Sequence, residues 1–273
     1  MIMFASDLDR TLIYSQRALS EMGTPLNKEM VPVEKRNGEN VSYMKGTALN
    51  LLKELASEAL FVPVTTRTYE QYNRIYIFAE EIPVTYSVTS NGANIHYKGE
   101  VLSEWTETVQ SKLAEECSKK EDLMKLLQGY KLPGKLKIAD DLFFYFILEE
   151  QITSDTKKQI GDIAAENGWK LSLQGRKLYF MPSPVCKGEA VKFIQKRESI
   201  TQIAGAGDSL LDVPLLDVCT YPFMPRHGEM ASELMSGNTF TFTKFQGANA
   251  GEEIIKSVHQ LIKRSSTPLQ ESL

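Results

Sequence analysis

The sequence predicts an α/β fold: a parallel-sheet core with helices on both faces, interrupted by an inserted α+β module. Three observations lead to this prediction. Helix and strand patterns alternate over residues 1–88 and again over 184–273. Between these segments, residues 89–183 run through a helix-strand-strand order twice. Several short apolar strands end in polar residues, as strands do at the functional edge of a parallel sheet.

The composition indicates an ordinary globular protein. The chain has 273 residues, 42% of them hydrophobic, and a formal net charge of −4. A mildly acidic chain without a basic tract argues against a nucleic acid or an anionic membrane surface as partner. The longest apolar run, 142–148, has seven residues, whereas a membrane helix needs about 20. Three scattered cysteines are typical of reduced thiols. We therefore expect a cytoplasmic protein, either a monomer or a small homo-oligomer.

The first half of the core is predicted from apolar periodicity and turn signals. Asn37-Gly38, between two β-prone stretches of 31–43, predicts a tight hairpin. Apolar residues at helical spacing predict a helix over 45–59. The other expected elements are strands over 2–6, 60–64 and 84–88, and a helix over 69–81.

The insert is bounded by two turn-rich segments, Ser90-Asn91-Gly92-Ala93 and Pro182-Ser183-Pro184. Its expected elements are helices over 105–127 and 155–167, and strands over 135–139, 143–148, 170–173 and 177–181. After the insert, the pattern predicts a helix over 188–195 and a strand over 199–204. We therefore expect a discontinuous core of residues 1–88 and 184–273, and a cap of residues 89–183.

Polar residues follow three of the predicted strands. They form the groups Asp7/Asp9/Thr11, Thr65/Arg67 and Asp208/Asp212. Because the carboxyl ends of parallel strands meet at one edge of a sheet, we expect the three groups to converge. Two carboxylates held close together repel unless a cation or a shared proton relieves them. Mg²⁺, which prefers oxygen ligands, is the expected cation.

The same residues carry a family resemblance. Asp7-Leu8-Asp9-Arg10-Thr11 resembles the first motif of the haloacid dehalogenase-like (HAD) hydrolases, a superfamily dominated by phosphatases. Thr65, Lys187 and the segment 207–212 (Gly-Asp-Ser-Leu-Leu-Asp) resemble its other three motifs, in the family's order. The resemblance implies a Rossmann-like core with a type-2B cap. The junction at 90–93 is similar to that of Cof-type and sucrose-phosphatase-like members. Arg10 and the long stretch before the first long helix look like the hydrolases of bacterial tellurite-resistance gene clusters.

The resemblance implies a Mg²⁺-dependent phosphatase that acts on a small soluble phosphomonoester, a sugar phosphate or related metabolite. Asp7 would attack phosphorus and form an aspartyl-phosphate, while Asp9 would protonate the leaving oxygen. Thr65 and Lys187 would bind phosphate oxygens. The implied metal residues are Asp7, Asp9 (through its carbonyl), Asp208 and Asp212, the last holding either Lys187 or a metal-bound water. The implied substrate-binding residues are Arg10, Thr11, Thr66, Arg67, Asn91 and Gly92.

Each residue has a plainer explanation when taken alone: a helix cap for Thr65, a solvated lysine for Lys187, a turn for Asp208. Their joint occurrence favours a functional site. Two alternatives stay open: a phosphosugar mutase of the phosphomannomutase type, and a non-catalytic regulatory protein that binds Mg²⁺ and phosphate. Arg10 and Leu211 depart from the usual family residues, which weakens any transfer of substrate identity. We expect His227 on a surface loop near the site, and structural roles for His96 and His259.

Overall fold

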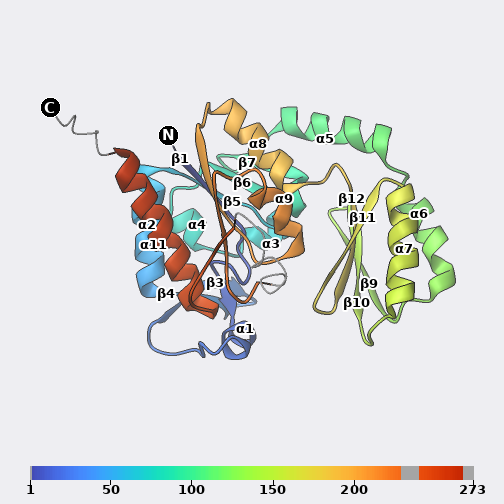
Figure 1. Ribbon diagram of the computed structural model, residues 1–273, viewed down its shortest axis with the longest axis horizontal. Helices are drawn as coiled ribbons and strands as arrows, with labels where there is room; N and C mark the ends of the chain where they lie inside the picture. The colour runs from blue at the N-terminus through green and yellow to red at the C-terminus, as the bar shows by residue number, and fades with distance from the viewer. Residues whose placement is uncertain (1, 229–239, 267–273) are drawn as a thin grey trace.

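The structure is a computed structural model that describes residues 2–228 and 240–266, and it consists of a core and a cap (Figure 1). Residues 229–239 and 267–273 of the expected core lie outside the described part. The core sheet has the order β15-β14-β13-β1-β5, and all its strands are parallel. Its strands are β1 (Ile2–Ser6), β5 (Leu60–Pro63), β13 (Gln202–Ala206), β14 (Tyr221–Met224) and β15 (Thr241–Phe242).

Helices cover both faces of this sheet, as predicted (Figure 1). Successive residues of a strand point to opposite faces. Phe4 of β1 therefore packs in one hydrophobic cluster with α2 (Gly46–Glu58) and α11 (Gly247–Ser266). Its neighbour Met3 packs in the opposite cluster with α8 (Lys187–Arg197), α9 (Val213–Leu216) and α5 (Ser103–Glu116). The central strand is thus buried on both sides.

Two small antiparallel sheets flank the core. The first has the order β2-β4-β3, and its hairpin, residues 30–45, is called the flap below. The predicted turn is confirmed: Asn37 and Gly38 both have positive φ, at 52° and 83°. The second sheet, β6-β7-β8, adjoins β5 through a parallel bridge between Val64 and Val88. The bounds are β2 Tyr14–Ser15, α1 Gln16–Glu21, β3 Met30–Arg36, β4 Glu39–Lys45, β6 Tyr86–Thr89, β7 Asn94–Tyr97 and β8 Glu100–Val101.

The cap is a four-stranded antiparallel sheet in the order β11-β12-β10-β9. Two helices, α6 (Lys120–Leu127) and α7 (Ser154–Glu166), lie on the side away from the core (Figure 1). Its strands are β9 (Gly134–Ala139), β10 (Phe143–Leu148), β11 (Trp169–Gln174) and β12 (Lys177–Pro182). The other face of the sheet is turned toward the core.

Two of the predicted helices are broken. The helix expected over 69–81 is two short helices, α3 (Tyr69–Tyr72) and α4 (Ile77–Glu80), because the Arg74 carbonyl between them accepts a hydrogen bond from Lys35 N–H in the flap. The helix expected over 105–127 is α5 and α6. The backbone is extended at Cys117, where α5 ends, and Ser118 N–H bonds the Asn167 carbonyl. Short 3₁₀ turns lie at Ser90–Gly92, Gln128–Tyr130 and Leu210–Asp212.

Helix α5 lies within the segment expected to form the cap, but it packs on the core. Its residues Trp105 and Val109 belong to the same hydrophobic cluster as Val191 and Ile194 of α8. The division of the chain into a core of 1–88 and 184–273 and a cap of 89–183 therefore stays a prediction.

Among the described residues, no helix combines the length and apolar character needed to cross a bilayer.

Gly168 of the cap lies against the end of α5. It has φ +78°, and a Cβ there would lie 1.9 Å from the Glu116 carbonyl oxygen. We expect Gly168→Ala to lower the free energy of unfolding by about 3 kcal/mol, through backbone strain and overlap together. Gly175→Ala, at φ +54° with open space around it, is the matched control and should lose only about 1 kcal/mol. Equal losses of unfolding free energy for the two variants in urea would contradict the argument that the close approach requires glycine at position 168.

Candidate active site

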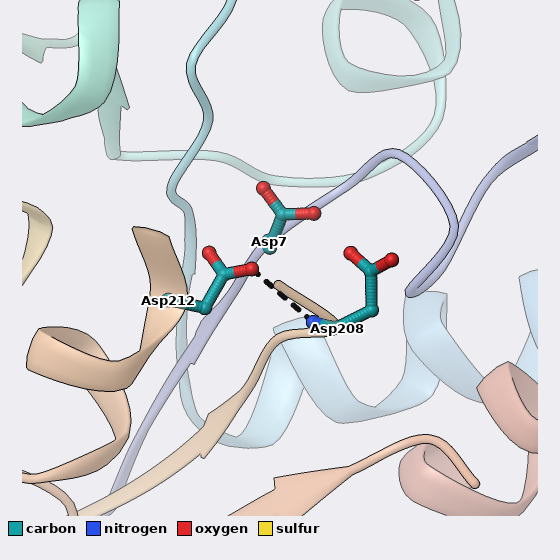
Figure 2. A group of neighbouring side chains, drawn as sticks. All are labelled: Asp7, Asp208 and Asp212. Carbon is teal, nitrogen blue, oxygen red and sulfur yellow. Dashed lines mark hydrogen bonds between the residues drawn. The ribbon is translucent and has the colours of Figure 1, made fainter. Parts of the chain in front are cut away.

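Three buried carboxylates meet at the carboxyl edge of the core sheet (Figure 2). Asp7 follows β1, Asp208 follows the neighbouring strand β13, and Asp212 ends the 3₁₀ turn that comes next. One oxygen from each lies within 4.8 Å of the other two. The expected convergence of these strand ends is therefore present.

A buried ammonium lies between two of these carboxylates. Lys187 is the first residue of α8, and its Nζ donates to Asp7 Oδ1 and to Asp212 Oδ1, each at 2.6 Å. Its side chain is only 1% exposed. Burial acts to lower the pKa of Lys187, but the two carboxylates outweigh it and raise that pKa above its ordinary value. Lys187 is therefore a fixed positive charge in the site.

Gly92 allows Lys187 to reach this position. Its φ is +99°, and a Cβ there would lie 2.4 Å from the carbonyl oxygen of Cys186. Only glycine permits this close approach between the 90–93 turn and the start of α8. Gly92, which the resemblance implies as a substrate-binding residue, thus has a packing role here. Its neighbour Asn91 is buried, and its Nδ2 donates to the Val185 carbonyl at 3.4 Å.

The oxygens of Asp212 are occupied by protein donors. Oδ1 accepts from Lys187, and Oδ2 accepts from the Asp208 and Ser209 amides and the Ser209 hydroxyl at 2.7–3.2 Å. Among the residues that the structure describes, Asp7 Oδ2 and Asp208 Oδ1 share only the Thr11 hydroxyl, which lies 3.4 Å from each. The pair Asp7/Asp208 therefore keeps oxygen lone pairs for a further ligand.

The charges of this cluster do not balance. Burial raises the pKa of Asp7 to about 7 even though Lys187 acts to lower it. Burial together with Asp7 and Asp212 raises the pKa of Asp208 well above its ordinary value. The further cation near Asp208 is Arg10, whose Nε lies 3.4 Å from Oδ2 on a side chain that is half exposed. Two carboxylates with free oxygen lone pairs, in a cluster with excess negative charge, fit a hard divalent cation such as Mg²⁺.

Asp9 belongs to a second cluster, centred on Arg67. The guanidinium of Arg67 binds both carboxylate oxygens of Asp9, at 2.7 and 2.8 Å. Burial acts to raise the pKa of Asp9, but the hydrogen bonds and charge of Arg67 lower it below its ordinary value. Asp9 is therefore ionised and held in one orientation.

Glu34 completes this second cluster, and the sequence did not point to it. It is buried, it accepts from Arg67 at 2.9 and 3.0 Å and from Ser42 Oγ at 2.5 Å, and it forms an ion pair with Arg74, whose Nε lies 3.2 Å from Oε1. The pairing of the two flap strands shifts register on both sides of Glu34, so the side chains there do not alternate regularly between the two faces. Regular alternation, the signal available from sequence, places Glu34 on the face opposite to the buried Val33.

His227 has a definite partner rather than a free surface position. It is half-buried; its Nδ1 accepts from Gly247 N–H at 3.1 Å, so its Nε2 carries the proton and donates to the Arg10 carbonyl at 2.7 Å. This bond supports Arg10, a non-glycine residue at φ +65°. The other two histidines, His96 and His259, are both buried, and His96 stacks on Tyr69 with 3.7 Å between ring centroids.

The two threonines that follow β5 differ in their surroundings. Thr65 is fully buried, and its Oγ1 accepts from Arg67 N–H at 3.1 Å, which shapes the turn after β5. Thr66 lies in that turn and is half-buried. The structure thus joins most of the predicted site residues in two hydrogen-bonded clusters: Asp7, Thr11, Lys187, Asp208 and Asp212 in one, Asp9 and Arg67 in the other.

Comparisons with known proteins agree with this architecture. No family model matches the chain, and no curated protein does. Solved structures do match. A sucrose-phosphatase from Synechocystis sp. PCC6803, in complex with sucrose and phosphate, has a TM-score of 0.70 at 16% identity, over 94% of this chain and 97% of its own. The chain has the fold of the HAD-like phosphatases.

Two further HAD structures support this assignment of the fold. A haloacid dehalogenase-like hydrolase from Bacillus subtilis has a TM-score of 0.58 at 16% identity, over 95% of this chain and 91% of its own. A HAD phosphatase from Bacteroides thetaiotaomicron has a TM-score of 0.58 at 10% identity, over 96% of each chain. The HAD-like fold that the four motifs predicted is therefore confirmed over nearly the whole chain.

Replacing Glu34 tests the second cluster. Glu34→Gln removes one buried negative charge and leaves Arg67 and Arg74 partly uncompensated. We expect a loss of about 3 kcal/mol in the free energy of unfolding, as for other broken buried ion pairs. The control is Glu29→Gln, since Glu29 is mostly exposed and 3.8 Å from Lys45; it should change stability by less than about 0.5 kcal/mol. A Glu34→Gln protein as stable as this control would contradict the assignment.

The raised pKa of Asp7 predicts a pH dependence of stability in chelator. Folded Asp7 keeps its proton up to a pH of about 7, whereas the ordinary value is 3.8. Between these values the folded state binds more protons, so this group's contribution to stability falls as pH rises, by at most about 1.4 kcal/mol per pH unit. Asp7→Asn should remove that part of the slope. Parallel stability curves for the wild type and Asp7→Asn would show that Asp7 is not perturbed.

Proposed function

We propose that this protein is a Mg²⁺-dependent phosphatase that hydrolyses a small phosphomonoester through an aspartyl-phosphate on Asp7. The observation that carries the proposal is the surroundings of Asp7. Its Oδ1 accepts from the buried Lys187 ammonium, and its Oδ2 shares the Thr11 hydroxyl with Asp208. A carboxylate nucleophile with a fixed cation and a second carboxylate beside it is the set that phosphoryl transfer requires.

The reaction has two steps. In the first, an Asp7 oxygen forms a bond to phosphorus as the bond to the leaving oxygen breaks, and Asp9 in its protonated form, the minor form in the free protein, gives that oxygen a proton. In the second, water attacks phosphorus, Asp9 takes a proton from it, and the bond to Asp7 breaks. The hydrogen bonds from Arg67 suit Asp9 to the second step, because they hold an ionised carboxylate in one orientation. Lys187 and Thr65 bind phosphate oxygens, and Asp212 positions Lys187.

Asp7, Asp208 and the Asp9 carbonyl would hold the Mg²⁺. Bound there, the ion supplies positive charge between an anionic nucleophile and an anionic phosphate. The occupied oxygens of Asp212 favour a role toward Lys187 over direct metal binding. Phosphatases among the structures of similar fold, including one solved with sucrose and phosphate, support a sugar phosphate or related metabolite as substrate.

Asp7→Asn tests the nucleophile. We expect it to abolish phosphate release while leaving the circular dichroism spectrum unchanged, because an amide is nearly isosteric but a far weaker nucleophile. The matched control is Asp155→Asn, the same change on exposed α7 of the cap, which should keep wild-type activity. The assay is phosphate release from sugar phosphates, nucleotides and an aryl phosphate, with Mg²⁺ and with chelator.

The same assay separates the alternatives. Normal turnover by Asp7→Asn, or equal turnover in chelator, would refute the proposed mechanism. If no compound releases phosphate, a bisphosphate-activated isomerisation assay tests the mutase. If that also fails while Mg²⁺ still raises the melting temperature, the site binds without catalysis.

A further inference from the structure

Arg10 is the positively charged residue that contacts Asp208. Its Nε lies 3.4 Å from Asp208 Oδ2, and its side chain is 49% exposed, whereas that of Asp208 is 10% exposed. Strong charge-assisted hydrogen bonds have donor–acceptor distances of about 2.7–2.9 Å, so this longer contact is a weak ion pair. Ion pairs with an exposed partner contribute little to stability. The guanidinium can therefore leave Asp208 at a small cost in free energy.

Lys187 is a cation of the opposite kind. Its side chain is buried, and its Nζ lies 2.6 Å from one oxygen of Asp7 and 2.6 Å from one oxygen of Asp212. Removing the partner of a buried charge is strongly destabilising, so Lys187 does not exchange its partners. The carboxylate cluster is therefore balanced in part by one fixed cation, Lys187, and in part by one exchangeable cation, Arg10.

The backbone of Arg10 is held in place although its side chain is not. Its N–H donates to the Ile13 carbonyl at 2.8 Å, and its carbonyl accepts from His227 Nε2 at 2.7 Å. These bonds hold Arg10 at φ +65°, a conformation that residues with a side chain seldom adopt. Because the backbone is fixed, the guanidinium moves only by rotation of its own side chain, and it stays within reach of Asp208.

The carboxylate that Arg10 contacts is also one of the two with lone pairs for a further ligand. Asp7 and Asp208 share the Thr11 hydroxyl, and their carboxylates point into the same space (Figure 2). A divalent cation bound to Asp208 and a guanidinium beside it are like charges that share one anion, so each weakens the binding of the other. Because such coupling is reciprocal, removing one of the two strengthens the binding of the other.

We propose that Arg10 competes with Mg²⁺ for Asp208 and thereby sets the affinity of the site for its metal. The inference rests on the proposed function, since it takes Asp7 and Asp208 as metal ligands. It gives a role to a residue outside the ligand set: Arg10 keeps the affinity for Mg²⁺ lower than the carboxylates and Lys187 alone would give. When Mg²⁺ binds, the guanidinium leaves Asp208 and moves toward solvent, to which its side chain is already half exposed.

Three variants of Arg10 test this competition through metal affinity, which does not depend on turnover. Arg10→Gln removes the charge, Arg10→Gly removes it and also suits the positive φ, and Arg10→Lys keeps a cation. The Nζ of lysine extends one bond beyond the position of arginine Nε, so the ammonium can still reach Asp208. The dissociation constant for Mg²⁺ is measured by calorimetry at about pH 8.5, where protons compete only weakly for metal ligands.

We expect Arg10→Gln and Arg10→Gly to bind Mg²⁺ at least about fivefold tighter than the wild type, and Arg10→Lys to stay within about twofold of it. Arg10→Gly also guards against a failure to fold, because glycine adopts φ +65° without strain. The matched control is Arg36→Gln, the same loss of charge on an exposed residue of the flap. It should leave the affinity for Mg²⁺ unchanged.

The outcomes separate the competition from the proposed function. Equal Mg²⁺ affinity in the wild type and Arg10→Gln, or equal tightening by Arg36→Gln and Arg10→Gln, would refute the competition and leave the phosphatase standing. Tightening by Arg10→Lys as large as that by Arg10→Gln would also refute it, because the charge would then have no effect. Mg²⁺ binding by none of the proteins, with phosphate release that chelator does not change, would refute the metal site of the proposed function and the competition with it.

Discussion

The ammonium of Lys187 is the constraint on which the site depends. Three carboxylates buried at one sheet edge repel one another, and burying a charge without a partner is costly. Lys187 relieves part of this repulsion because it contacts Asp7 and Asp212 at the same distance, 2.6 Å. Lys187 takes this position only if α8 starts against the turn at residues 90–93. That close contact requires glycine at position 92. Chain segments far apart in sequence are therefore fixed relative to one another by a single charged group.

A second hydrogen-bonded network lies beside the first and is centred on Arg67. Asp9 binds Nε and Nη2 of the Arg67 guanidinium, and Glu34 binds Nη1 and Nη2, so the flap is linked through Arg67 to the loop that follows β1. Arg74 joins from the segment between α3 and α4. Charges of opposite sign alternate along this network, and their attraction offsets the free-energy cost of removing the charged groups from water. The flap is thus a structural part of the site.

The sequence predicted those features that local patterns control. The strand 2–6, the Asn37-Gly38 turn and the two helix-strand-strand units depend on periodicity and turn chemistry, and all are present. The convergence of Asp7, Asp208 and Asp212 followed from the geometry of parallel strands. The break in the helix at Cys117 was missed because it depends on hydrogen bonds to residues about 50 positions away. Glu34 was missed because its burial depends on a local irregularity in strand register.

The two chain segments that connect the core to the cap form hydrogen bonds with the same small region. Ser118 N–H bonds the Asn167 carbonyl, Ser183 N–H bonds the Gly168 carbonyl, and the Cys117 thiol also reaches that carbonyl. The segment between the two connections begins and ends at nearly the same point, so replacing it leaves the strand register of the core unaltered. A change of sequence within this segment therefore leaves Asp7, Asp208 and Asp212 in place, because all three follow strands of the core sheet.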